Sequence, residues 1–206
     1  MDTLEQCLKK GIEEAAPKIM MLTGNHLHIS YNKLGIIHIT DAGSLLGSDD
    51  TPVVGVAMTL MHEPMMKYLM LTIPETRDLI ATSIMGKMAA ENEAMSNSLF
   101  QEIGNVLGTT IANALSVFVA RQVTTSPPDA ISDMSGSIVS SILSDFEALD
   151  DHIILLNIKL LTNATPVDAE IYLFFDHQLT RQILAELQFE RTVETNNSHS
   201  GGYFYD

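Results

Sequence analysis

The sequence predicts an α+β fold in which a largely antiparallel sheet is covered by helices. One observation is that apolar residues recur at helical spacing in some segments and in strand-like runs in others. Over the 206 residues these segments follow the order helix, strands, helix, and this order occurs twice. A second observation is that two stretches about half a chain apart share local sequence. Together they predict an internally duplicated, pseudo-twofold domain with two long helices in corresponding places.

The shared stretches are YLMLTIPETRDLI, residues 68–80, and YLFFDHQLTRQIL, residues 172–184. Both run from an apolar strand into a helix that carries a Thr-Arg pair, and an offset of 104 residues aligns them. We therefore expect one domain over residues 1–190, with a first half of about 1–90 and a second half of about 91–190. The polar, Gly-rich residues 191–206 are expected to form a flexible C-terminal tail.

In the first half, Thr3 followed by Gln6 is typical of a capping box and predicts a helix over residues 3–22. Pro17 predicts a kink in this helix, because it removes one backbone hydrogen bond. Alternating apolar residues predict strands within 26–39, broken near 32–35, and the Gly, Ser and Asp content of 40–52 predicts a loop. Two further strands, 53–62 and 67–73, are expected to form a hairpin.

The second half begins after a short helix predicted at 75–87, with a long helix from about residue 91 to 122. Pro127 and Pro128 are expected to end a strand at 122–125, since proline cannot donate to a sheet. The remaining predictions are a helix at 135–149, strands at 152–161 and 168–175, and a helix at 178–190.

Composition excludes several classes of function. A formal net charge of -15 would repel nucleic-acid phosphates and anionic membranes. The most apolar runs are about ten residues, short of the roughly 20 that cross a bilayer, so we expect no membrane insertion. The single cysteine, Cys7, cannot form an internal disulfide, and residues 1–10 lack the pattern of a secretory signal. A cytoplasmic protein is the expectation.

A polar patch lies on the long helix. Ser98, Glu102 and Asn105 follow helical spacing and share one face, away from the apolar stripe. On spacing alone, ordinary solvated polar residues are the favoured interpretation, because such triplets are common on surface helices.

These residues form the pattern SxxxExxN, and Pro128 follows after 22 intervening residues. The pattern resembles the motif of the CheC/CheX/FliY family of chemotaxis phosphatases: Asp or Ser, three residues, Glu, two residues, Asn, and a distant Pro. The stretches GNVLGTTIANALS and LDDHIILLNIKL also look like that family, so the likeness runs from about residue 98 to 187. Length and duplicated order make the chain most similar to CheC.

The resemblance implies a phosphatase that hydrolyses the aspartyl phosphate of a phosphorylated CheY-like response regulator. Asn105 would orient the attacking water and Glu102 would dock the regulator, with Ser98 and Pro128 as structural support. The chain would need no cofactor of its own, because Mg would come from the regulator. The alternative is a non-catalytic adaptor for a receiver, for CheD or for the flagellar switch. Exposed edge strands also make a homodimer a candidate assembly.

The first predicted helix is expected to be an altered copy of the long helix. An offset of 96 residues places Asp2, Gln6 and Lys9 opposite the three patch residues. A lysine offers only donors and a glutamine carries no charge, so the sequence predicts one active site per chain.

Three histidines in the first half give another candidate site. His26 and His28 share one strand face, and His38 comes close across a turn, which makes a metal site one interpretation. No cysteine accompanies them, and ordinary strand histidines are the favoured interpretation. Cys7 is expected to be an inert thiol, and the 12 methionines are expected to fill core and interface.

Overall fold

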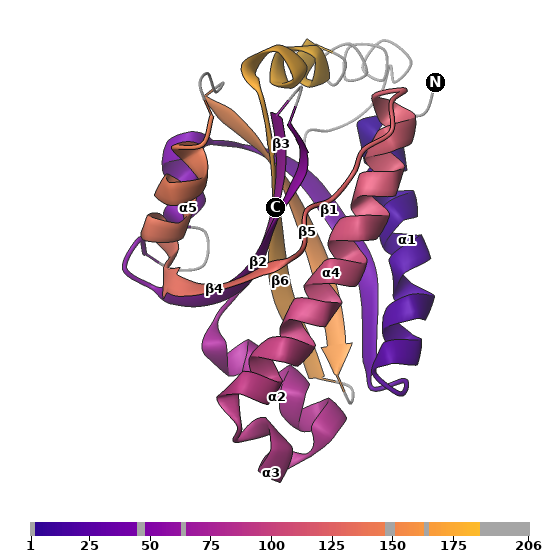
Figure 1. Ribbon diagram of the computed structural model, residues 1–206, viewed down its shortest axis with the longest axis vertical. Coiled ribbons are helices and arrows are strands. Elements are labelled where there is room, and N and C mark those ends of the chain that lie inside the picture. The colour runs from indigo at the N-terminus through magenta and orange to yellow at the C-terminus, as the bar shows by residue number, and fades with distance from the viewer. Residues whose placement is uncertain (1–2, 45–47, 63–64, 147–150, 163–164, 186–206) are drawn as a thin grey trace, which may run out of the picture.

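The computed structural model describes residues 3–44, 48–62, 65–146, 151–162 and 165–185. Within these ranges one six-stranded antiparallel sheet runs through the molecule, with two long helices packed on one face and a shorter helix on the other (Figure 1). The predicted α+β class, a largely antiparallel sheet covered by helices, is confirmed. Within the described ranges, none of the helices is long and apolar enough to cross a membrane.

The helices are α1 (Leu4–Leu22), α2 (Pro74–Met85), α3 (Lys87–Ala90), α4 (Glu93–Phe118) and α5 (Ser135–Leu143), with a 3-10 helix η1 (Ile39–Ser44) and a helical segment at 177–185. The strands are β1 (Leu27–His38), β2 (Pro52–His62), β3 (Met65–Thr72), β4 (Asp129–Met134), β5 (His152–Thr162) and β6 (Thr165–Phe175).

The strand order makes the internal duplication visible. The sheet runs β1-β5-β6-β3-β2-β4, and exchanging each strand of one half for its counterpart in the other reverses this order. The two halves are therefore related by an approximate twofold axis through the central β6–β3 pair. The ends of the long helices agree, since Gly24 after α1 and Ala120 after α4 both have a positive φ, 58° and 51°. These two residues are 96 positions apart, the offset expected from the sequence.

The offset of 104 residues expected for the shared stretches is wrong by one. Tyr68 lies in the core under α1 and α4, whereas Tyr172 lies in the core under α5. A twofold axis perpendicular to the sheet keeps equivalent residues on the same face, so these tyrosines are not equivalent. Successive side chains of a strand point to opposite faces. An offset of 104 joins residues on opposite faces, so the offset between β3 and β6 must be an odd number. An offset of 103 fits, since it aligns the starts of α2 and of the 177–185 helix and pairs buried Ile80 with buried Ile183.

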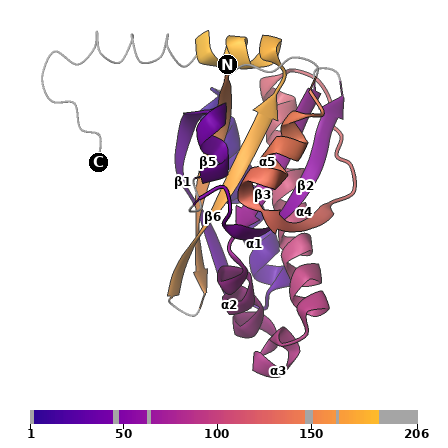
Figure 2. The same cartoon turned by 90° about the vertical axis from the view of Figure 1, so that its left-hand side faces the viewer.

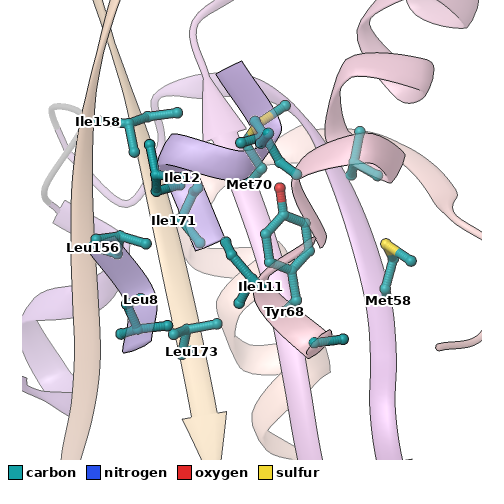
Figure 3. Packing of buried hydrophobic residues seen from close by; sticks show 14 of the residues in the cluster. Leu8, Ile12, Met58, Tyr68, Met70, Ile111, Leu156, Ile158, Ile171 and Leu173 are labelled. Carbon is teal, nitrogen blue, oxygen red and sulfur yellow. The ribbon is translucent and has the colours of Figure 1, made fainter. Parts of the chain in front are cut away.

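Two cores sandwich the sheet. In the larger core, Leu8 and Ile12 of α1 and Ile111 of α4 pack on strand residues such as Tyr68 (Figure 3). The two helices approach closely at Gly11, where a Cβ would lie 3.1 Å from the Cβ of Ala114. The smaller core lies under α5 and η1 (Figure 2) and contains the following buried residues: Ala42, Val53, Leu69, Leu71, Ile138, Val139, Ile142, Ile153, Leu155, Tyr172 and Phe174.

Several elements differ from the sequence-based expectation. β1 continues through 32–35 and absorbs the irregularity as a register shift between Tyr31 and Lys33, and η1 occupies part of the expected loop. α1 contains Pro17 and continues past it to Leu22, as expected, and the kink expected there stays a prediction. The strand expected at 122–125 does not form, and β4 begins instead at Asp129, directly after the two prolines that cannot donate to a ladder.

The last expected helices shift as well. α5 ends at Leu143, short of the expected 149, and residues 147–150 lie outside the described ranges. The helix expected at 178–190 is seen at 177–185, and its remainder and the expected tail, 191–206, also lie outside them.

Candidate functional site

α4, the helix that carries the predicted site, is fixed at its beginning. Asn92 caps it by accepting hydrogen bonds from the backbone N–H groups of Ala94 and Met95, at 3.1 and 3.4 Å. The buried guanidinium of Arg77 on α2 donates to the Asn97 side chain at 2.6 Å. It also lies 3.6 Å from Glu93. The first turns of α4 are thus tied to α2.

The middle of α4 lies unusually close to the sheet. A Cβ on Gly104 would come within 2.7 Å of Val56, and one on Gly108 within 2.5 Å of the Met58 sulfur. Only glycine permits this approach of backbone to strand. The close packing fixes the height and rotation of the helix, and hence the direction of its outer face.

The predicted patch lies on that outer face. Ser98 and Glu102 are exposed, and Asn105 is partly buried. The Ser98 hydroxyl donates to the carbonyl of Ala94 at 2.8 Å, so it is engaged with its own helix. Among the described residues, the side chains of Glu102 and Asn105 have no hydrogen-bond partner. A carboxylate and an amide are therefore presented together, available for a ligand or a partner protein.

The structure also brings Pro128 to this helix. The side-chain amide of Gln101 donates to the Pro128 carbonyl at 2.6 Å. The segment before β4 is thereby held to α4 at Gln101, the residue that precedes Glu102 in the sequence. Sequence reasoning missed Gln101, because a polar residue beside a motif gives no signal until its distant partner is known.

The altered copy on α1 has a structural use of its own. The Thr3 N–H donates to Gln6 Oε1, and the Gln6 N–H donates to Thr3 Oγ1, both at 3.2 Å. This is the predicted capping box, and it is confirmed. Lys9 is exposed, and Asp2 lies outside the described residues. Gln6, which corresponds to Glu102 in the altered copy, thus helps to cap the N-terminus of α1.

His28 and His38 lie towards opposite ends of β1, where they pair with Leu161 and His152 respectively. His38 packs edge-to-face on His152, with ring centroids 5.9 Å apart, and its Nδ1 lies 2.8 Å from the Thr40 hydroxyl. Within the described ranges, no group of three or more His, Cys, Asp or Glu side chains is placed to hold a metal ion. Cys7 is buried in the described structure.

Burial shifts titration at three tyrosines, all outside the patch. Desolvation raises the pKa of Tyr31, Tyr68 and Tyr172 well above the usual value of 10.0. Glu5, which accepts a hydrogen bond from Tyr31, raises that pKa further, and the charge of Glu170 does so at Tyr172. These groups stay neutral in the folded protein at physiological pH.

No protein-family model and no curated protein matches the sequence. Solved structures do match. FliY from Thermotoga maritima aligns with a TM-score of 0.60 and 15% identity, over 86% of this chain and 90% of that one. The FliM middle domain from Vibrio alginolyticus aligns with a TM-score of 0.62 and 10% identity, over 88% and 99%. The chain has the fold of FliY and FliM.

A chain of the FliG–FliM complex from H. pylori is also similar, with a TM-score of 0.58 and 11% identity over 82% of this chain and 88% of that one. At these identities the likeness establishes the fold. It confirms the CheC/CheX/FliY resemblance at that level. The closer likeness to CheC stays a prediction.

Proposed function

We propose that the chain is a phosphatase that hydrolyses the aspartyl phosphate of a phosphorylated CheY-like receiver, with one active site on α4. The observation that carries this proposal is the pairing of exposed Glu102 with partly buried Asn105 on a rigid helix. Neither side chain has a hydrogen-bond partner among the described residues, and Pro128 is held on the same helix through its hydrogen bond with Gln101. This arrangement matches the family motif in residue type and in order.

The proposed reaction needs positioning rather than a covalent intermediate on this chain. A water attacks the phosphorus in line, and the bond from phosphorus to the receiver's carboxylate oxygen breaks, giving inorganic phosphate and a free carboxylate. The Asn105 amide cannot act as a base, but its oxygen accepts a hydrogen bond from the water and its N–H₂ group donates to an oxygen of the phosphoryl group. Holding the water in this line supplies the rate enhancement.

Glu102 lies one turn before Asn105, so their Cβ atoms are about 5–6 Å apart. In the proposed complex it pairs with a cationic side chain at the receiver's phosphorylation site. The receiver supplies the Mg that neutralises the phosphoryl oxygens. Glu102 thus determines docking, whereas Asn105 determines hydrolysis.

The second candidate is a non-catalytic adaptor that holds a receiver, CheD or a flagellar-switch protein with the same surface. The similarity to the FliM middle domain, at a TM-score of 0.62, favours it. One of the similar structures is a FliG–FliM complex. An adaptor has no specific need for an amide at Asn105, which separates the two candidates.

The decisive measurement is the decay of radiolabelled phosphate on a CheY-like receiver from the same organism, with and without the full chain. We expect faster decay at substoichiometric protein. No acceleration at stoichiometric excess would remove the enzyme proposal, and binding retained under those conditions would establish the adaptor.

Two variants test the separate roles. Asn105→Ala should lower hydrolysis by about 10² or more while leaving receiver affinity unchanged. Glu102→Gln should weaken receiver binding by about tenfold, the loss typical of a charge-assisted contact. Glu13→Gln, an equal change at an exposed carboxylate on α1, is the matched control and should alter neither quantity. Equal effects of the two site variants on affinity would contradict the assignment.

A further inference from the structure

β4 is a terminal strand of the sheet, and its outer edge is open. Within the described part of the chain no strand pairs with that edge. Five of its six residues are exposed, and only Ile131 is partly buried. An open edge presents unpaired backbone N–H and C=O groups that can pair with another strand.

A cleft of about 350 Å³ lies beside this edge, between α5 and the strands β2, β3 and β4. Asp129, Ile131, Ser132 and Asp133 line it from β4. Of these, Asp129, Ile131 and Asp133 share one face, because alternate residues of a strand point the same way. Ile138 and Ile142 of α5 also line it (Figure 2 shows α5 over the strands). The edge and the cleft therefore form one continuous surface.

The charges that this surface leaves unneutralised are negative. Among the described residues that line the cleft, Lys67 is the only lysine; it is 15% exposed and forms an ion pair with Asp145, so its charge is already neutralised. Asp129 and Asp133 remain on either side of Ile131. Asp133 accepts a hydrogen bond from the Met134 N–H at 2.7 Å, which leaves its charge in place. The open edge thus presents an acidic, apolar, acidic pattern.

We propose that β4 binds an extended, basic segment of a partner protein by strand addition. The segment carries Lys or Arg, then an apolar residue, then Lys or Arg at alternate positions. Directly opposed side chains of paired strands interact, so these residues meet Asp129, Ile131 and Asp133 in register. The acceptor pattern is symmetric, so the added strand can run in either direction.

A second copy of this chain is a poor occupant of the same edge. Two β4 strands paired antiparallel about Ile131 would place Asp129 of each copy opposite Asp133 of the other. Like charges directly opposed across a strand pair are destabilising. The net charge of -15 adds to the repulsion between copies.

The proposal does not depend on phosphatase activity. The proposed strand-addition surface faces α5, whereas α4, which carries Glu102 and Asn105, packs on the other face of the sheet.

The test uses the full chain and a labelled peptide, Thr-Lys-Thr-Val-Thr-Lys-Thr, followed by fluorescence anisotropy. A control peptide of the same composition, Thr-Thr-Lys-Val-Lys-Thr-Thr, moves both lysines to the opposite strand face. We expect the first peptide to bind about tenfold more tightly or better. The double variant Asp129→Asn with Asp133→Asn should abolish this preference. Glu13→Gln with Glu14→Gln changes the net charge equally at exposed sites on α1 and should preserve it.

Backbone pairing is tested with two N-methylated peptides. Only alternate amides of an added strand face β4, so methylation of one alternate set should abolish binding and methylation of the other should not. Absence of binding at about 1 mM peptide, equal binding of the two peptide patterns, or equal tolerance of both methylated sets would each overturn the proposal. Dimers in analytical ultracentrifugation that Ile131→Asp dissociates would overturn it as well, because they would assign the edge to a second copy.

Discussion

The hydroxyl group of Tyr68 is a buried polar group whose hydrogen-bonding capacity is not satisfied among the described residues. The Tyr68 ring lies beneath α4, where a Cβ on Gly108 would be 3.4 Å from it. The side chain is fully buried, and its hydroxyl has no hydrogen-bond partner in the described structure. Figure 3 shows this oxygen among apolar side chains. Burying a hydroxyl without a partner costs free energy that folding must offset.

Tyr68→Phe should therefore raise the free energy of unfolding by about 1 kcal/mol, because it deletes the hydroxyl and keeps the ring. Urea denaturation followed by circular dichroism would measure this as a higher midpoint with an unchanged slope. A lower midpoint would mean that the hydroxyl is hydrogen-bonded in solution, for example to a buried water.

At the scale of the element, the position of α4 depends on Gly104 as well as on its apolar stripe. Gly104 lies between Glu102 and Asn105 in sequence and on the opposite, buried side of the helix. Its close approach to Val56 means that an added carbon must shift either α4 or β2. A shift of α4 would move the two proposed functional side chains.

Gly104→Ala should lower the free energy of unfolding by about 1–3 kcal/mol, the usual cost of overpacking, despite the better helix propensity of alanine. Gly35→Ala is the matched control, since its Cβ would make only ordinary contacts, at 3.9 Å from Leu155. Chemical denaturation of both variants gives the comparison. Equal stability of the two variants would show that α4 adjusts at no cost.

At the scale of the whole molecule, features that depend on residues close in sequence could be predicted, whereas contacts between distant segments could not. The capping box at Thr3 and the long helix α4 depend on residues three and four apart, and both could be predicted from sequence. The Gln101 contact with Pro128 joins segments 27 residues apart and gave no sequence signal. β4 was missed because the prolines before it masked a short, polar edge strand.

The duplication was likewise predicted in part. The repeated order of elements follows from the spacing of apolar residues along the chain, and it could be predicted. The offset of the shared stretches depends on which sheet face each residue occupies, and aligned letters placed Tyr68 opposite Tyr172 on the wrong face. For the candidate site, helical spacing placed Ser98, Glu102 and Asn105 together correctly, while their roles rest on the resemblance.

The net charge of -15 makes a prediction for the molecule as a whole. Self-repulsion of the compact state is screened by salt, because the Debye length falls from about 30 Å at 0.01 M to about 10 Å at 0.1 M. Raising NaCl from about 0.01 M to about 0.3 M at neutral pH should stabilise the fold by about 1 kcal/mol, or about 3 °C in Tm. Differential scanning calorimetry would measure the shift. The control is the same titration near the pI of 4.6, where the net charge approaches zero and the shift should largely vanish. An equal rise at both pH values would attribute the stabilisation to general salt effects on burial instead of charge repulsion.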